Sequence, residues 1–236
     1  TVKGLIKNKP LIAILCASLI FMMNMMLVGA VNVYLFKDYF SSAGTLSFVS
    51  IAQTIAVLLC APFIKTLTTK FGKKEMSLVG LLIASAAYFF LFFLKDIDAM
   101  TFIYISFIGF IGFGLFNTVI WAFVTDVIDY QEYLTDLRED GTVYSVYSFA
   151  RKVGQALAGG IGGFAIAAIG YDASREVQTN EALNGIHTLA TLVPAVVYLG
   201  IFLILLFFYP LNKTRLAKMQ EELEARRGAK ESKVIK

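Results

Sequence analysis

Long apolar runs separated by short polar segments make up most of the chain. The runs cover residues 11–36, 46–64, 76–94, 99–124, 142–170 and 187–209. Each run supplies the roughly 20 residues that a helix needs to cross a hydrocarbon core of ~30 Å. The apolar positions do not alternate with a period of two, which argues against strands. The pattern therefore predicts an all-α integral membrane protein with a six-helix transmembrane bundle over residues 11–209.

The two ends of the chain are polar. We expect residues 1–10 to form a cytoplasmic linker, and residues 210–236 a charged cytoplasmic tail. The tail composition favours a short solvated helix that frays into disorder, and lipid binding is the alternative. No signal-peptide cleavage motif is evident before the first run. Because the chain starts at Thr1 and six helices are half of a twelve-helix transporter, we expect a fragment of a longer protein.

Composition agrees with a membrane protein, since 58% of the residues are hydrophobic, 16% are charged and 21 are Phe. Cys16 and Cys60 both lie inside apolar runs that lack further metal-ligand side chains. We therefore expect both cysteines to be core residues. We expect no metal site, no cofactor and no nucleic-acid partner.

The distribution of basic residues predicts the orientation in the membrane. Placing the amino end, the second and fourth connections and the tail in the cytoplasm gathers 18 of the 21 basic residues on one side. Lys37, Lys95 and Arg175 are left on the other side. We predict a multi-pass protein of the cell membrane with both termini in the cytoplasm.

Acidic residues follow the fourth apolar run. Asp126, Asp129 and Tyr133 recur at helical spacing, so the helix is expected to continue beyond the membrane with its carboxylates on one face. Arg138 is a nearby basic partner, and a basic loop or a second half of the protein could supply others. The alternative is that these acids are solvated loop charges, and the spacing alone does not decide between the two.

Lys152 lies inside the fifth run. A helix that begins near Thr142 would place its ammonium about 15 Å deep, where a charge needs a polar cavity. One face of this helix carries polar and small residues, namely Ser145, Ser148, Lys152, Gln155, Gly159 and Gly163. The alternative is a span over residues 153–170 alone, with Arg151 and Lys152 as an ordinary interfacial flank.

Several other polar side chains interrupt the apolar runs. They are Asn24, Asn32, Gln53, Asn117, Trp121 and Thr125. An indole that stacks on a pyranose, together with amides and an ammonium that bind its hydroxyls, is typical of a sugar site. Single amides more often join helices in a membrane, and Trp121 is equally suited to be an interfacial anchor.

Two segments resemble a known family. The segment "DVIDYQEYLTDLREDGTVYSVYSFARKVGQALAGGIGGFAIAAIGY", residues 126–171, resembles the glycoside-pentoside-hexuronide:cation symporters, the melibiose-carrier family of the major facilitator superfamily. The segment "PFIKTLTTKFGKK", residues 62–74, resembles a cytoplasmic turn in the second half of that family. The resemblance covers essentially the whole chain. It implies the carboxy-terminal half of a twelve-helix fold around a central sugar cavity.

The resemblance also implies roles for individual residues. Lys152 matches a lysine that faces the cavity and supports coupling between sugar and cation. Asp126, Asp129 and Arg138 match charge pairs that close the cytoplasmic side. The expected activity is symport of a sugar or glycoside with Na⁺ or H⁺, in partnership with a missing amino-terminal half that holds the family's cation-binding carboxylates.

Other function classes are less well supported. The sequence has one histidine, His187, and neither an H-E-x-x-H nor a G-x-S-x-G motif, so we do not expect an enzyme. A lipid carrier of the same superfamily, with a lysophospholipid-like substrate, is one alternative. A membrane subunit without transport activity is the other.

Overall fold

The computed structural model describes residues 2–234, with side chains from residue 5 to residue 229. Thr1 of the predicted linker, and Ile235 and Lys236 of the predicted tail, lie outside the described residues. The described part is helical and has no strand, which confirms the predicted all-α fold. Its elements are α1 (Val2–Lys7), α2 (Lys9–Tyr34), a π-helix (Leu35–Tyr39), a 3-10 helix (Ala43–Thr45), α3 (Leu46–Phe71), α4 (Lys73–Phe93), α5 (Ala99–Thr135), α6 (Asp140–Ala168), α7 (Asn180–Phe208) and α8 (Lys213–Val234).

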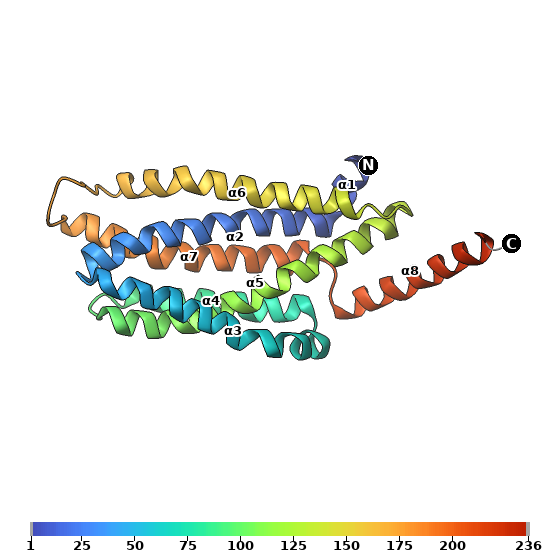
Figure 1. Cartoon of the computed structure of the whole chain (residues 1–236), viewed down its shortest axis with the longest axis horizontal. Helices are drawn as coiled ribbons and strands as arrows, with labels where there is room; N and C mark the ends of the chain where they lie inside the picture. The colour runs from blue at the N-terminus through green and yellow to red at the C-terminus, as the bar shows by residue number, and fades with distance from the viewer. Residues whose placement is uncertain (1, 235–236) are drawn as a thin grey trace.

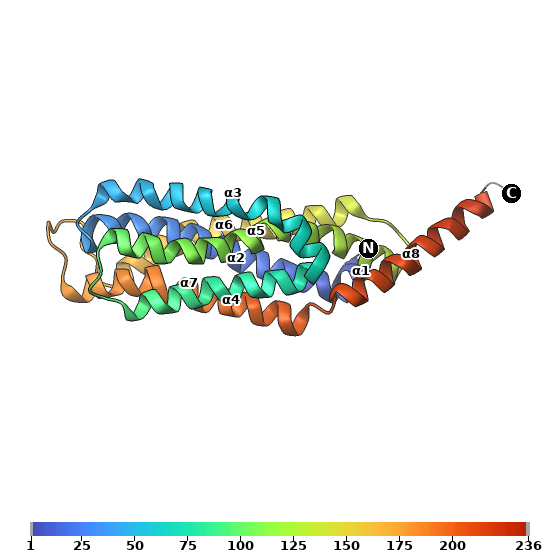
Figure 2. The same cartoon turned by 90° about the horizontal axis from the view of Figure 1, so that it is seen from below.

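Helices α2 to α7 lie side by side as a bundle, and α1 and α8 lie at the same end of it (Figure 1). Helix α2 packs against α6 and α7, while α5 packs against α3 and α4. Helices α4 and α7 pack on each other along the edge of the bundle opposite α3 (Figure 2). Helix α6 has few contacts with α5, and much of the surface of α6 is left uncovered.

Five segments in the described part of the chain are long and apolar enough to cross a membrane. They are Lys9–Tyr39, Ala43–Phe71, Lys73–Phe93, Ala99–Thr135 and Asn180–Phe208. The fifth predicted span corresponds to α6, which has 29 residues but is less apolar. Its length is sufficient, whereas Arg151, Lys152 and several glycines lower its hydropathy. Composition by itself therefore supports five of the six predicted spans.

Several helices extend beyond the apolar runs. Helix α3 continues seven residues past the predicted end of its span, to Phe71, and α5 continues to Thr135. The 37 residues of α5 correspond to about 55 Å, well above the ~30 Å hydrocarbon core. Its end is set by Asp136, which has a left-handed backbone conformation with φ 56°. Backbone hydrogen bonding does not require apolar side chains, so a helix continues where its hydrophobic run stops.

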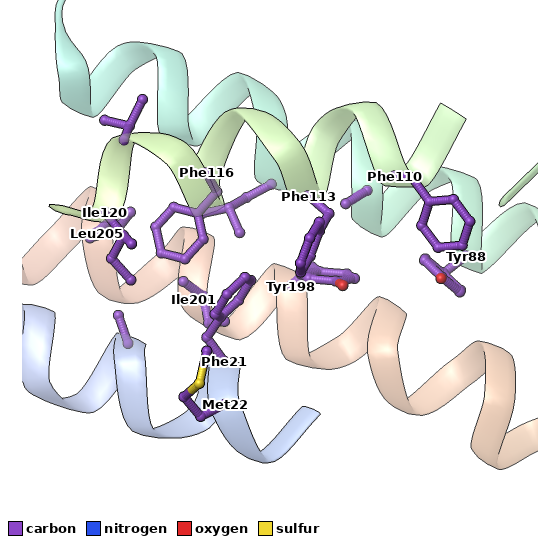
Figure 3. Packing of buried hydrophobic residues seen from close by; sticks show 14 of the residues in the cluster. Phe21, Met22, Tyr88, Phe110, Phe113, Phe116, Ile120, Tyr198, Ile201 and Leu205 are labelled. Carbon is purple, nitrogen blue, oxygen red and sulfur yellow. The ribbon is translucent and has the colours of Figure 1, made fainter. Parts of the chain in front are cut away.

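Aromatic and aliphatic side chains fill the interior of the bundle (Figure 3). The Phe21 ring of α2 stacks on Phe113 of α5 with a centroid distance of 5.2 Å, and it meets Phe116 edge-on at 5.0 Å. Ile201 and Leu205 of α7 are fully buried in the same cluster. These contacts hold α2, α5 and α7 together in the middle of the bundle.

The contact between α2 and α6 depends on a small residue. A Cβ atom on Gly154 would lie 2.8 Å from the carbonyl oxygen of Leu19, closer than such atoms normally approach. Gly159 and Gly160, one to two turns further along α6, face open space. Close approach of helix backbones at small residues is a common way to associate helices in a membrane. Gly154 therefore sets which face of α6 is buried against α2.

Two sequence expectations need correction. Cys60 is buried, but Cys16 is exposed and is not a core residue. The tail is one continuous helix, α8, rather than a short fraying one. Its Met219 and Leu223 are buried in the main hydrophobic cluster because they lie four positions apart on one helix face.

Candidate functional site

Trp121 and Arg151 form the centre of a cation–aromatic cluster between α5 and α6. The Arg151 guanidinium carbon lies 4.8 Å from the centroid of the Trp121 ring. Nη1 of Arg151 donates a hydrogen bond to the Tyr147 hydroxyl at 3.1 Å, and the Tyr147 ring meets Trp121 edge-on at 5.5 Å. Tyr147 is fully buried, whereas Trp121 is 46% exposed. The cluster thus presents an open indole surface beside a fixed guanidinium.

Lys152, Gln155 and the rest of the predicted polar face of α6 are mostly solvent-accessible. Within the described residues, Lys152 forms no ion pair, and Gln155 lies 3.7 Å from the sulfur of Met22. Helix α6 begins at Asp140, which places Lys152 twelve residues, or about 18 Å, along the helix. The buried face of α6 is a different one, formed by Val143, Tyr147, Gly154, Ala158, Gly162 and Ile166.

The other residues that the sequence analysis considered for a sugar site do not form one surface. Asn117 is half-buried on the same helix as Trp121. Asn24 is buried beside Tyr198, and neither of its amide atoms has a hydrogen-bond partner of standard geometry. Gln53 lines a separate cavity of about 190 Å³ inside the bundle together with Asn32, Tyr88 and Tyr198. No hydrogen bond or ring contact joins Gln53 or Asn24 to Trp121 in the described part of the chain.

A buried ion pair ties the turn between α3 and α4 to α5. Nζ of Lys73 lies 2.6 Å from Oδ1 of Asp126, whose side chain is only 2% exposed. The helices α3 and α4 are separated by Gly72, whose φ of 106° favours glycine. This tight turn directs Lys73 back onto α5. The basic loop therefore supplies a partner for Asp126, one of the two acids expected to close the cytoplasmic side.

Asp129, the second acid expected to close the cytoplasmic side, belongs to a charge network at the end of α5. Arg138 lies 3.2 Å from Asp129, a pairing that the sequence analysis expected, and 3.3 Å from Glu132, which it did not single out. Asp126, the other expected acid, pairs with Lys73 instead. Arg227 of α8 binds the same two carboxylates and donates from Nε to Glu132 at 3.0 Å. Hydrogen bonding to Glu132 raises the pKa of Arg227, so the guanidinium stays charged. The tail is thus part of the network.

Further contacts stabilise the end of the bundle at which α5 and α8 meet. Arg226 lies over the Tyr133 ring at 4.7 Å and pairs with Asp136 at 3.5 Å. Lys74 donates to the carbonyl of Tyr209 at 2.6 Å, which satisfies the carboxyl end of α7. Asn8 caps α2 through the amide of Leu11. The contacts of Arg226 connect α8 to the end of α5, and that of Lys74 connects α4 to the end of α7, while the Asn8 cap is local to α2.

Sequence reasoning missed Glu132, Arg227, Tyr147 and the role of Arg151. Arg151 was expected only as an interfacial flank, yet it stacks on the tryptophan that the sequence singled out. Tyr147 precedes Arg151 by one helical turn, a spacing that places two side chains on one face. Nothing local to the tail indicates that Arg227 binds Glu132, because the two residues are 95 positions apart.

Comparison with known proteins identifies the family. The sequence pattern of the MFS/sugar transport protein family matches residues 1–213. The chain is 31% identical to the glucuronide carrier protein homolog of Escherichia coli over 222 residues, which cover 94% of this chain and 48% of that protein. It is 31% identical to the isoprimeverose transporter of Lactiplantibacillus pentosus over 95% of this chain and 46% of that protein.

A third relative, the putative glycoside/cation symporter YagG of Escherichia coli, is 38% identical over 118 residues, or 49% of this chain and 25% of the relative. These relatives are named as carriers, transporters or symporters, and none of the three is named as an enzyme. The chain spans about half the length of the first two relatives. The helical bundle and the match over residues 1–213 place this chain in the MFS/sugar transport protein family, as the resemblance to the glycoside-pentoside-hexuronide symporters predicts.

Proposed function

We propose that this chain forms the carboxy-terminal half of a secondary transporter that moves a sugar or glycoside across the cell membrane by alternating access. The observation that carries the proposal is the half-exposed indole of Trp121 beside Arg151 and Lys152 of α6, which form no ion pair within the described residues. An indole offers an apolar platform for a pyranose ring, and ammonium and guanidinium groups donate to its hydroxyls. The names of the glucuronide, isoprimeverose and glycoside relatives support the same substrate class.

The accessible surface of α6, with the neighbouring Trp121 of α5, is the natural position for a second six-helix half. In this arrangement the sugar binds between the halves, near the level of Trp121 and Lys152. Cation coupling is part of the proposal, with Na⁺ or H⁺ bound by carboxylates of the other half. Lys152 repels that cation until a facing acid balances its charge, which links the cation to the sugar.

The charge network on Asp126 and Asp129 is proposed as part of the cytoplasmic gate. It lies at the end of the bundle that also carries α1 and α8 (Figure 1). The excess of basic residues at this end favours a cytoplasmic location, with both termini inside the cell. Breaking such pairs biases a two-state equilibrium by a few kcal/mol, so the network can tune the balance between inward-open and outward-open states.

Vesicle transport tests the proposal. The full-length protein is placed in vesicles under an imposed Na⁺ or H⁺ gradient, with radiolabelled glycosides in one arm and radiolabelled lysophospholipids in the other. We expect accumulation of a glycoside that collapses when an ionophore dissipates the gradient. Movement of lysophospholipid without any glycoside would favour the lipid-carrier alternative, and transport of neither would favour a non-transporting subunit.

A further inference from the structure

An apolar groove of about 810 Å³ lies between the start of α2 and the end of α7. Both of these helix ends are at the end of the bundle that carries α1 and α8 (Figure 1). Apolar side chains of the two helices line the groove, namely Ile12, Cys16, Ile20, Ile204, Phe207 and Phe208. Lys9 is the only charged side chain that the described residues contribute to it.

The groove opens away from the core of the bundle. Ile12, Cys16 and Ile20 recur every four residues along one side of α2. The buried Ile14 and Phe21 lie on the opposite side of the same helix. No described residue of α5 or α6 lines the groove, so it is separate from the surface proposed for the second half of the transporter. The groove therefore faces the lipid of the membrane.

The length of the groove matches one acyl chain. Lys9 and Ile20 are eleven positions apart, which corresponds to about 16 Å along a helix. Lys9 is also the first residue of the membrane-spanning segment Lys9–Tyr39. Because half of the hydrocarbon core is about 15 Å thick, the groove runs from the membrane surface to near the midplane. Between its ends, the short side chains of Ala13 and Cys16 leave room for a chain of methylene groups.

The charge at the surface end of the groove has no partner in the described part of the chain. Lys9 is exposed and forms no ion pair there. It lies in the first turn of α2, which contains no acidic residue. A cation is unfavourable at the amino end of a helix, because the helix dipole is positive there. An anion bound at this position would balance both the ammonium and the helix end.

We infer that the groove binds one anionic phospholipid of the leaflet proposed to be cytoplasmic. One acyl chain lies between α2 and α7, and the phosphate of the headgroup accepts hydrogen bonds from the ammonium of Lys9. Each methylene group that enters the groove adds to the affinity. Contact with bulk lipid requires neither a groove of this length nor a cation at its end. The lipid is a bound component of the protein and not its cargo.

The test measures binding of two phospholipids to the full-length protein. The purified protein in detergent is titrated with dioleoyl phosphatidylglycerol or dioleoyl phosphatidylcholine, and native mass spectrometry counts the bound lipids. The two lipids have the same acyl chains, but only the first has a net negative charge. We expect one saturable site that prefers phosphatidylglycerol. Lys9→Gln should lower this preference about fivefold, whereas Lys65→Gln, which removes an exposed lysine outside the groove, should leave it unchanged.

A second variant tests the groove itself and covers a failure of Lys9→Gln to insert. Cys16→Phe places a ring in the groove at an exposed position, so binding of both lipids to the saturable site should be lost. Val196→Phe adds a ring at an exposed position of α7 outside the groove and should preserve binding.

Three results would overturn the inference: equal affinity of the parent for the two lipids, an unchanged preference in Lys9→Gln, or unchanged binding in Cys16→Phe. Pairing of two copies of the protein that Cys16→Phe disrupts, without any bound lipid, would also overturn it and would assign the groove to a second copy. The measurement uses no sugar and no ion gradient, so its outcome is independent of the proposed transport.

Discussion

Lys73 and Asp126 are 53 positions apart in the sequence, yet their Nζ and Oδ1 atoms lie 2.6 Å apart. The pair connects the tight turn after α3 to the part of α5 that extends beyond its apolar run. The Asp126 side chain is almost inaccessible, and that of Lys73 is 29% exposed. The carboxylate thus depends on this one ammonium among the described side chains for its compensating charge.

Replacement of Lys73 should therefore be costly. We expect Lys73→Met to destabilise the folded protein by about 3 kcal/mol, because it leaves a buried carboxylate without a counter-charge. The double variant Lys73→Met/Asp126→Asn should recover part of this loss. Thermal unfolding of the purified full-length protein measures both effects, with Lys65→Met as the control for an exposed lysine that has no ion pair among the described side chains. Equal stability of the single variant and the control would show that the pair contributes nothing.

Loss of Asp129 should open the cytoplasmic side. Asp129→Asn weakens the contacts to both Arg138 and Arg227, so we expect a shift toward the inward-open state. Labelling of a cysteine introduced at the exposed position Thr125, in a background without native cysteines, should become faster.

Asp140→Asn is the matched control for Asp129→Asn. Asp140 binds the same Arg138, but it is only two positions away in the sequence and does not connect α5 to α8. Labelling that is unchanged in Asp129→Asn would indicate that the acid is merely solvated.

The tail helix should loosen when Arg227 is replaced. Arg227→Gln removes the ion pairs that α8 makes with Glu132 and Asp129, while Met219 and Leu223 remain buried. Hydrogen exchange of the amides in residues 213–229 should increase by several-fold, and high salt should have the same effect on the parent by screening partly exposed pairs. Lys218→Gln changes an exposed charge on the same helix and should leave exchange as it is.

Lys152 should matter for transport rather than for folding. It is exposed and unpaired in the described residues, so Lys152→Ala should insert and express normally. We expect gradient-driven accumulation of sugar to be lost, since the ammonium balances the coupling cation. Lys37→Ala, which removes another exposed lysine, serves as the control. Accumulation equal to that of the parent would assign Lys152 to an ordinary interfacial flank.

Two glycines of α6 should respond differently to the same change. Gly154→Ala should destabilise the bundle, because the new methyl group would meet the backbone of Leu19. Gly160→Ala faces open space and should be neutral or stabilising by about 0.5 kcal/mol, as expected for alanine in a helix. Unfolding temperatures of the two variants provide the comparison. A similar shift in unfolding temperature for both variants would show that α2 and α6 can move apart at Gly154 without loss of stability.

The sequence by itself determined the helical class and the positions of the apolar runs. Both are properties of consecutive residues, since a membrane-crossing helix is recognised by its length and hydropathy alone. Helical spacing also predicted that Asp126, Asp129 and Tyr133 continue one helix, and α5 does contain all three. The pairing of Arg138 with Asp129 could be predicted from the sequence because the two residues are only nine positions apart.

Only the tertiary structure decided which distant groups meet. Pairs such as Lys73 with Asp126 and Arg227 with Glu132 depend on how helices are rotated and shifted against one another. The same rotation separates Gln53 from Trp121 and brings Arg151, which the sequence left as a flank, onto the indole. Helix periodicity defines faces but not which face is buried, and in α6 that choice depends on the fit of Gly154 against the backbone of α2.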